Sequence, residues 1–364
     1  MRSIAQVSPL GSASLAALLA MLSPWTPAWS ACSVDRGAAG ATAPLTRHLG
    51  QDCSAQEREA QAVPAAELLV ALKAGRGLDL EGVVVTGDLA LDQLPLLPPE
   101  AVFKLPPRIQ DIIPVADIRD VRLIAGPVTI KDSLVRGTIK TNLTTGLLVI
   151  NGPVTMTGTT FERMVDLSYA VFGGPVDFSH AILLREGFFI HAWFAEGARF
   201  EATALGTHSR FHKATFAGPV TFKRAGFNGL AEFLEVQFQQ EAQFAQTYFK
   251  LGTGFSGSRF GGLLDFSEAR FDREAFFTYA LFAKDAYFRR ATFAGVADFS
   301  DAEFRGLEDF SKVMFALEPR FTRTKLTGER PIPRGLQDLR IMYGIVAALI
   351  LFLFWFIYLL KKQS

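Results

Sequence analysis

The most regular feature of the chain is a large apolar residue that recurs alternately after five and six residues, from Leu123 to Leu326. From Phe211 to Phe321 every such position is phenylalanine, and Thr145 is the single polar interruption of the series. An α-helix repeats its apolar residues at about 3.6 positions and a strand at 2, so neither explains this spacing. A fixed period sustained over this length predicts a repeat architecture.

A second series of small residues lies two positions before the large ones, as at Ala286, which precedes Phe288. Side chains two positions apart point the same way on an extended backbone. Each unit is therefore expected to be a short extended piece with two inward side chains, followed by a corner. Gly-Pro pairs, such as those at 174–175 and 218–219, suit corners because glycine permits unusual φ angles and proline presets one. Four pieces close a square coil of 22 residues, and coils stack through backbone hydrogen bonds.

The tandem units, for example Ala286-Tyr-Phe288-Arg-Arg-Ala291-Thr-Phe293, resemble the phenylalanine-centred repeats of pentapeptide repeat proteins. The resemblance implies an all-β solenoid, a right-handed quadrilateral β-helix. The interval 121–327 then predicts about nine coils. The resemblance implies little about activity: the best-understood members of the family resemble duplex nucleic acid in shape and charge and bind topoisomerases.

The charge balance argues against that kind of mimicry. Of the 364 residues 20% are charged, and the formal net charge is +1. A nucleic-acid binder would carry a basic excess, and a mimic of nucleic acid would carry an acidic one. We therefore predict no nucleic-acid partner.

Residues 1–30 have the pattern of an export signal peptide. Arg2 supplies a positive start, residues 15–22 form a short apolar core, and Ala28-Trp-Ser30 is a small-x-small cleavage site. The alternative is an uncleaved anchor, although the core is shorter than the ~20 apolar residues that span a bilayer.

Cys32 and Cys53 are the only cysteines, and in an exported chain two cysteines this close in sequence predict a disulfide. An alternative is lipidation of Cys32, because the preceding Trp29-Ser-Ala resembles a lipoprotein processing site. A metal site is disfavoured, because His48 is the only further ligand type nearby.

Residues 31–120 are expected to form an N-terminal cap region. A helix is predicted over 64–75, with proline near its start, glycine at its end, and Leu68, Leu69 and Leu72 on one face. Residues 80–91 suggest a first, irregular coil, and the proline-rich stretch 93–117 suggests a surface excursion. A cap is needed because an open solenoid end exposes unpaired strand edges and an apolar cross-section.

Outward apolar side chains gather in two bands of the predicted coils and are candidates for partner contact. They are Ile182, Phe188 and Trp193 on one coil, and Phe276, Leu281 and Tyr287 four coils further on. The alternative is that these are singly scattered exposed residues, which are common on protein surfaces.

Catalytic, metal-binding and cofactor-binding constellations are nearly absent, and we predict none of the three. The coil period places His208 over Glu186, and it places His212 one position from the site over His191. In the alternative interpretation these are ordinary surface histidines. A second pair, Asp265 and Asp309, shares one face but lies two coils (~10 Å) apart, which is wide for paired acid–base catalysis.

Residues 341–360 are apolar throughout and are long enough to span one hydrocarbon core. We predict a transmembrane helix there, preceded by a tether at 328–340 and followed by a cytoplasmic tail at 361–364 that begins with Lys361 and Lys362. A buried cap helix is the alternative. With the export signal, this predicts a single-pass protein of a bacterial or archaeal cytoplasmic membrane whose coils lie on the extracytoplasmic side.

These features together predict a non-catalytic, membrane-anchored scaffold or protein-binding module, whose partner the sequence does not identify. A regular rod whose interior is filled by side chains presents flat rows of outward residues rather than a cleft. Two alternatives stay open: a polysaccharide-active β-helix enzyme, and an accessory subunit of a membrane complex that acts through residues 341–360.

Overall fold

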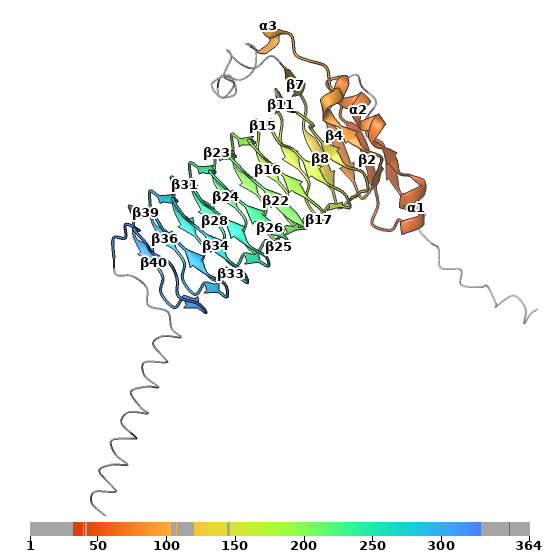
Figure 1. The fold of residues 1–364 in the computed structure, drawn as a ribbon. Helices are drawn as coiled ribbons and strands as arrows, with labels where there is room; N and C mark the ends of the chain where they lie inside the picture. Colours follow the sequence, from red (N-terminus) through yellow and green to blue (C-terminus); the bar gives the residue numbers. More distant parts are fainter. Residues whose placement is uncertain are drawn as a thin grey trace, which may run out of the picture.

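The computed structural model describes residues 32–38, 40, 42–102, 107, 120–143, 146–328 and 349. Within them the chain forms a β-solenoid that runs as a rod from the N-terminal to the C-terminal end (Figure 1). The predicted signal 1–30 lies outside these residues, and the predicted span 341–360 is described only at Leu349. No helix within the described ranges is long and apolar enough to cross a membrane.

Four sheets form the sides of the rod, and we name them A to D in the order in which the chain visits them. Sheet A contains β1 (Val34–Asp35), β2 (Leu45–Leu49), β4 (Leu78–Glu81), β8 (Val128–Lys131), β12 (Val154–Thr155), β16 (Val176–Asp177), β20 (Ala198–Arg199), β24 (Val220–Thr221), β28 (Ala242–Gln243), β32 (Leu264–Asp265), β36 (Ala286–Tyr287) and β40 (Glu308–Asp309). Sheet B contains β3 (Val63–Pro64), β5 (Val84–Thr86), β9 (Leu134–Val135), β13 (Thr160–Phe161), β17 (Ile182–Leu183), β21 (Ala204–Leu205), β25 (Gly226–Phe227), β29 (Tyr248–Phe249), β33 (Arg270–Phe271), β37 (Thr292–Phe293) and β41 (Met314–Phe315).

The other two sheets are shorter by two strands or more. Sheet C contains β6 (Leu89–Ala90), β10 (Ile139–Lys140), β14 (Val165–Asp166), β18 (Gly187–Phe188), β22 (His208–Arg210), β26 (Leu230–Glu232), β30 (Thr253–Gly254), β34 (Ala275–Phe276) and β38 (Ala297–Asp298). Sheet D contains β7 (Val121–Ile124), β11 (Leu147–Ile150), β15 (Ala170–Phe172), β19 (Trp193–Phe194), β23 (Thr215–Phe216), β27 (Gln237–Phe238), β31 (Arg259–Phe260), β35 (Leu281–Phe282) and β39 (Glu303–Phe304).

The solenoid has about eleven turns, so the predicted count of about nine is wrong. The additional turns come from β2 to β6, which lie before residue 121 and stack in parallel under the later coils. The alternating spacing does not reveal them, because α2 (Ala65–Lys73) takes the place of strands in the first turn and residues 91–120 interrupt the second. The right-handed sense of the coil stays a prediction from the family resemblance.

The register of the early coils also differs from the prediction. Ile150 pairs with Ile124 and Phe161 pairs with Val135, which are separations of 26 residues rather than 22. Four extra residues lie between β10 and β11, around the one polar interruption of the apolar series. As a result Ile124 and Val135 face the core where the spacing predicts Leu123 and Leu134.

The corners of the five-residue and the six-residue steps differ in backbone conformation. In each five-residue step the second residue after the large apolar one has a positive φ, and from Tyr169 to Arg323 such residues recur every eleven positions. All of them except Gly257 carry a side chain, which costs about 1–2 kcal/mol in this conformation. Stacking of neighbouring coils holds the strained residues in place, because the corner amides from Tyr169 to Asp301 bond the next coil, as Glu235 N–H does with the Ser256 carbonyl at 3.0 Å.

The core is a set of stacked phenylalanine columns that fill the axis of the rod. Rings on the same side of the rod lie parallel, as for Phe194 and Phe216 at 4.5 Å between centroids, whereas rings from opposite sides meet edge to face, as for Phe200 and Phe211 at 5.8 Å. Both arrangements are favourable for aromatic pairs. The early, aliphatic coils pack less fully: an apolar cavity of about 30 Å³ lies among Ile150, Leu167 and their neighbours.

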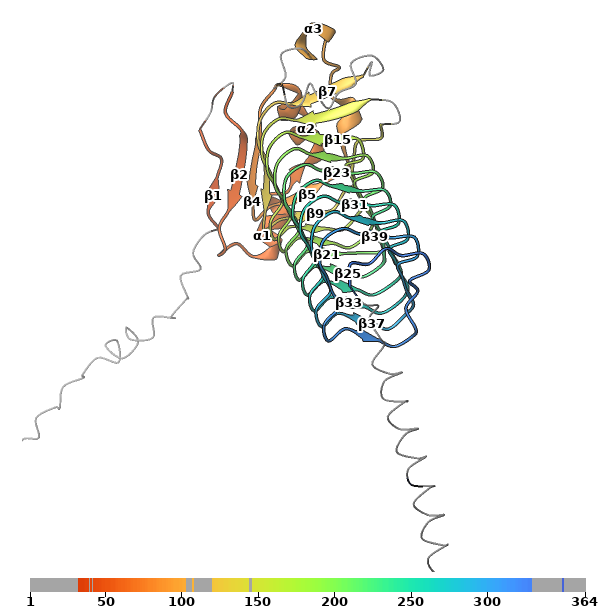
Figure 2. The ribbon, with the colours of Figure 1, turned by 90° about the vertical axis from the view of Figure 1, so that its left-hand side faces the viewer.

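The N-terminal end of the rod is covered by α2 and flanked by the antiparallel β1–β2 pair (Figure 2). The buried face of α2 contains Leu68 and Leu72, as the helix prediction requires, and Leu69 packs against the core less completely. The remaining helices are short: α1 (Ala55–Ala60), α3 (Pro99–Val102) and the 3-10 helix η1 (Leu91–Gln93). The Cys32–Cys53 disulfide (S–S 2.06 Å) fastens the beginning of the described chain to the start of α1.

A candidate binding groove on sheet A

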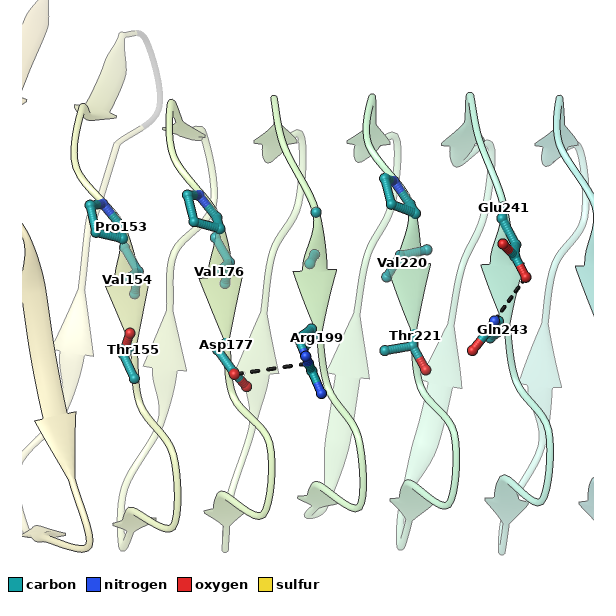
Figure 3. A pocket seen from close by; sticks show the side chains of 14 residues that line it. Pro153, Val154, Thr155, Val176, Asp177, Arg199, Val220, Thr221, Glu241 and Gln243 are labelled. Atoms are coloured by element: carbon teal, nitrogen blue, oxygen red, sulfur yellow. Dashed lines mark hydrogen bonds and ion pairs between the residues drawn. The ribbon is translucent and has the colours of Figure 1, made fainter.

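The outer side of sheet A contains a shallow groove of about 470 Å³ that crosses five coils, from β12 to β28 (Figure 3). One side is formed by residues at the corner that leads into the sheet, and the other by the outward residues of the strands. The lining residues are Pro153, Val154, Thr155, Pro175, Val176, Asp177, Gly197, Ala198, Arg199, Pro219, Val220, Thr221, Glu241 and Gln243.

The corner residues explain why the surface is hollow. Pro153, Pro175 and Pro219 offer compact rings, and Gly197 offers no side chain at the same place. Proline fits this position because the ladder uses its carbonyl: the carbonyl of Pro175 accepts from Val154 N–H at 3.0 Å, and proline has no N–H to satisfy. The floor of the groove is therefore apolar over four coils, and Glu241 takes the corner position in the fifth.

The outward row supplies polar groups at one per coil, about 4.8 Å apart. Thr155 and Thr221 have short side chains, and Arg199 lies between Asp177 (3.9 Å) and Glu201 (3.4 Å). The charge of Arg199 is thus shared with two carboxylates on a surface whose charges are mixed. An open groove with an apolar floor and a periodic polar row suits an extended partner that lies along the rod and forms hydrogen bonds with successive coils.

The six predicted contact residues do not form this groove or any other single surface. Ile182, Phe188 and Trp193 lie on sheets B, C and D of one coil, so their side chains point in three different directions. Ile182 is 41% exposed, whereas the ring of Phe188 lies under the guanidinium of Arg210 at 5.4 Å.

The second band divides in the same way. Phe276 is on sheet C, Leu281 on sheet D and Tyr287 on sheet A. Phe276 is 39% exposed, and the ring of Tyr287 is covered by the guanidinium of Arg289 at 4.2 Å. The reason is geometric: each step of five or six residues turns the chain onto the next side of the square. Residues that share a surface are 22 apart rather than five or six apart.

Trp193 instead belongs to an apolar cluster outside sheet D, which the sequence interpretation missed. Val121, Val149 and Val171 face outward and are buried, and Leu97 from the proline-rich excursion packs on them together with Trp193. The uninterrupted apolar run of β11, Leu147–Ile150, is the signal that could have revealed it, because a strand buried on both faces is apolar at every position.

A cluster on sheet C joins two of the histidines to Glu232. Its carboxylate lies 2.6 Å from His208 Nε2, 2.9 Å from Arg210 Nε and 3.3 Å from His212 Nε2. The strand register places His208 over Glu186 as predicted, because Gly187 pairs with Ser209. The side chain of His208 nevertheless contacts Glu232 of the following coil, and it is Thr207 that donates to Glu186. Among the described residues no three His, Cys, Asp or Glu side chains are placed to hold a metal ion.

The environment of Glu232 shifts its acidity. Partial burial raises the pKa of Glu232, but hydrogen bonds from His208 and Arg210 oppose burial and leave the pKa below its ordinary value of 4.5. A carboxyl whose pKa falls on folding stabilises the fold above its unfolded pKa, and this contribution is lost as the pH falls through the folded value.

We therefore expect Glu232→Gln to destabilise the coils at pH 7 by about 1 kcal/mol, because the glutamine cannot pair with Arg210 as a charge. The difference from wild type should shrink as the pH falls below 4.5. Hydrogen exchange of the coils near Glu232, at pH 7 and at pH 3, measures this difference in stability. An equal loss at both values would show that shape, not charge, matters at this position.

In the second chemical candidate, Asp265 with Asp309, Tyr287 lies between the two aspartates in sheet A. The guanidinium of Arg289 contacts Asp309 and covers Tyr287, whose hydroxyl donates to Asp285 at 3.2 Å. Burial raises the pKa of Asp309, but hydrogen bonds from Ser311 and Arg289 leave it lowered overall, so this carboxylate is an ionised partner of arginine.

The fold defines a class of protein: a solenoid with a square, phenylalanine-filled cross-section. A family profile described as Pentapeptide repeats (9 copies) matches residues 244–292 and 255–303. With the Phe-centred pattern, this shows that the chain is a pentapeptide repeat protein. Neither the curated proteins nor the solved structures include a significant match.

Proposed function

We propose that the chain is a non-catalytic, membrane-anchored scaffold that binds an extended protein partner along the groove of sheet A, on the extracytoplasmic side of the membrane. The observation that carries the binding role is the groove itself, which has an apolar floor over four coils and one outward residue per coil over five. Solenoids of this kind commonly present extended surfaces for binding.

The membrane anchor and the extracytoplasmic location are supported by the sequence. The signal pattern at 1–30 and the apolar segment at 341–360 flank the solenoid. The Cys32–Cys53 disulfide agrees with this location, because disulfides persist in oxidising compartments.

The test is an in-cell crosslink and pull-down of the full chain beside two matched variants. Thr221→Arg places a long cation in the middle of the groove, whereas Gln237→Arg makes the same type of change on sheet D. We expect Thr221→Arg to reduce recovery of the partner at least tenfold and Gln237→Arg to leave it unchanged. Equal recovery with both variants would remove the groove from the proposal.

A third variant, which lacks residues 341–360, distinguishes the role of a scaffold from that of a subunit of a membrane complex. A partner retained by that variant supports recognition by the coils. A partner lost only with the anchor would favour an accessory subunit of a membrane complex. Hydrolysis of a cell-wall or capsular polymer that disappears in Asp309→Ala would overturn the non-catalytic role.

A further inference from the structure

The last turn of the solenoid has an apolar rim that the preceding turn lacks. Leu307, Met314 and Leu317 are 56%, 48% and 51% exposed. One turn earlier the corresponding positions hold Asp285, Thr292 and Gly295. Apolar residues therefore replace polar or small ones at the coil that ends the rod.

In the part of the chain that the structure describes, the edges of sheets A and B at the end of the rod have no pairing partner. Among the described residues no strand follows β40 in sheet A or β41 in sheet B. Phe310 and Leu326, the apolar residues of this end, are only partly buried. Unpaired backbone groups need hydrogen-bonding partners, and an apolar cross-section needs cover.

Three cations lie on the other sides of the same rim. The side chains of Arg320, Arg323 and Lys325 are 62%, 70% and 75% exposed, and each contacts a carboxylate of the previous coil. Exposed apolar residues beside lysine and arginine are the combination that binds a bilayer interface, where anionic headgroups attract the cations.

The length of the tether limits what the C-terminal end of the rod can contact. From Gly328 to residue 341 the chain reaches at most about 45 Å when fully extended, at ~3.5 Å per residue. Anchoring at 341–360, on which this inference rests, therefore keeps the C-terminal end of the rod within about 45 Å of the membrane. Two copies anchored in one bilayer both direct this end toward it, which opposes an end-to-end dimer.

We propose that the C-terminal end of the solenoid rests on the lipid surface, with Leu307, Met314 and Leu317 in the interface and the rod standing away from the bilayer. The groove on sheet A then lies along the standing rod, at a fixed distance from the membrane. Headgroups and interfacial water satisfy the free strand edges.

The test compares two nitroxide labels on the full chain in vesicles of phosphatidylcholine and phosphatidylglycerol. Leu317→Cys and Leu251→Cys occupy the same corner position three coils apart, with 51% and 40% exposure. The two native cysteines are joined in a disulfide and do not react. We expect the ratio of oxygen to nickel-chelate accessibility to be several-fold higher at residue 317 than at residue 251.

The outcomes separate the two proposals. Failure of the full chain to float with vesicles would overturn the anchor and this inference with it. Flotation with a water-exposed label at residue 317 would overturn the inference alone, as would strong dipolar coupling between labels at 317 on two copies. Met314→Cys, also on the rim, gives the same readout if Leu317→Cys does not fold.

Discussion

Phe233→Ala is expected to destabilise the central coils by about 3–5 kcal/mol. The Phe233 side chain is fully buried, and its ring stacks on Phe211 at 4.8 Å and on Phe255 at 4.7 Å between centroids. Truncation removes both stacked contacts and leaves a cavity that rigid neighbouring coils cannot fill. Because each coil contacts mainly its neighbours, the loss should be concentrated near the substitution.

The matched control is Phe276→Ala, which removes the same side chain from an outward position that is 39% exposed. We expect a change of no more than about 1 kcal/mol there. Chemical denaturation followed by circular dichroism gives the overall effect, and hydrogen exchange of the coils around residue 233 gives the local one. Similar large losses at both positions would refute the assignment of inward and outward residues.

Gly229→Ala is expected to cost about 2–3 kcal/mol, although it adds only one methyl group. A Cβ at this corner would overlap the backbone carbonyl of Thr207 in the coil below. The overlap is with backbone, so no side-chain rotation relieves it, and the stack must open locally.

Gly226→Ala is the control, because a Cβ at residue 226 meets no atom within 4 Å. This residue lies on the outer face of sheet B, three positions away in the same coil. We expect unchanged or slightly increased stability, since alanine orders the unfolded chain more than glycine does. Comparable unfolding midpoints for the two variants would show that the corner has room to adjust.

Much of the fold was predictable because a solenoid is specified locally and then repeated. The spacing of large apolar residues assigns the inward position of every coil from Ile150 to Leu326, and the small residue two positions earlier assigns the second. The outward ladders follow from the same register, which the strand pairing confirms. The prediction failed where residues were inserted, between β10 and β11, because one change of spacing moves every earlier position.

The candidate site was less predictable. Sequence spacing identified the outward residues of sheet A, including Arg199 and Thr221, but not that prolines and a glycine beside them leave a hollow. Exposure and contact depend on how far side chains reach between coils. His208, for example, contacts Glu232 of the following coil rather than Glu186 of the preceding one.

The sequence by itself determined the solenoid, its square repeat, its phenylalanine core and its family, because these depend on the identity of residues at a fixed spacing. The tertiary structure decided which outward residues share a surface, that α2 and the additional coils close the N-terminal end, and that Trp193 packs in an outer apolar cluster. Those features depend on the packing of segments that no local period connects, such as the proline-rich excursion against sheet D.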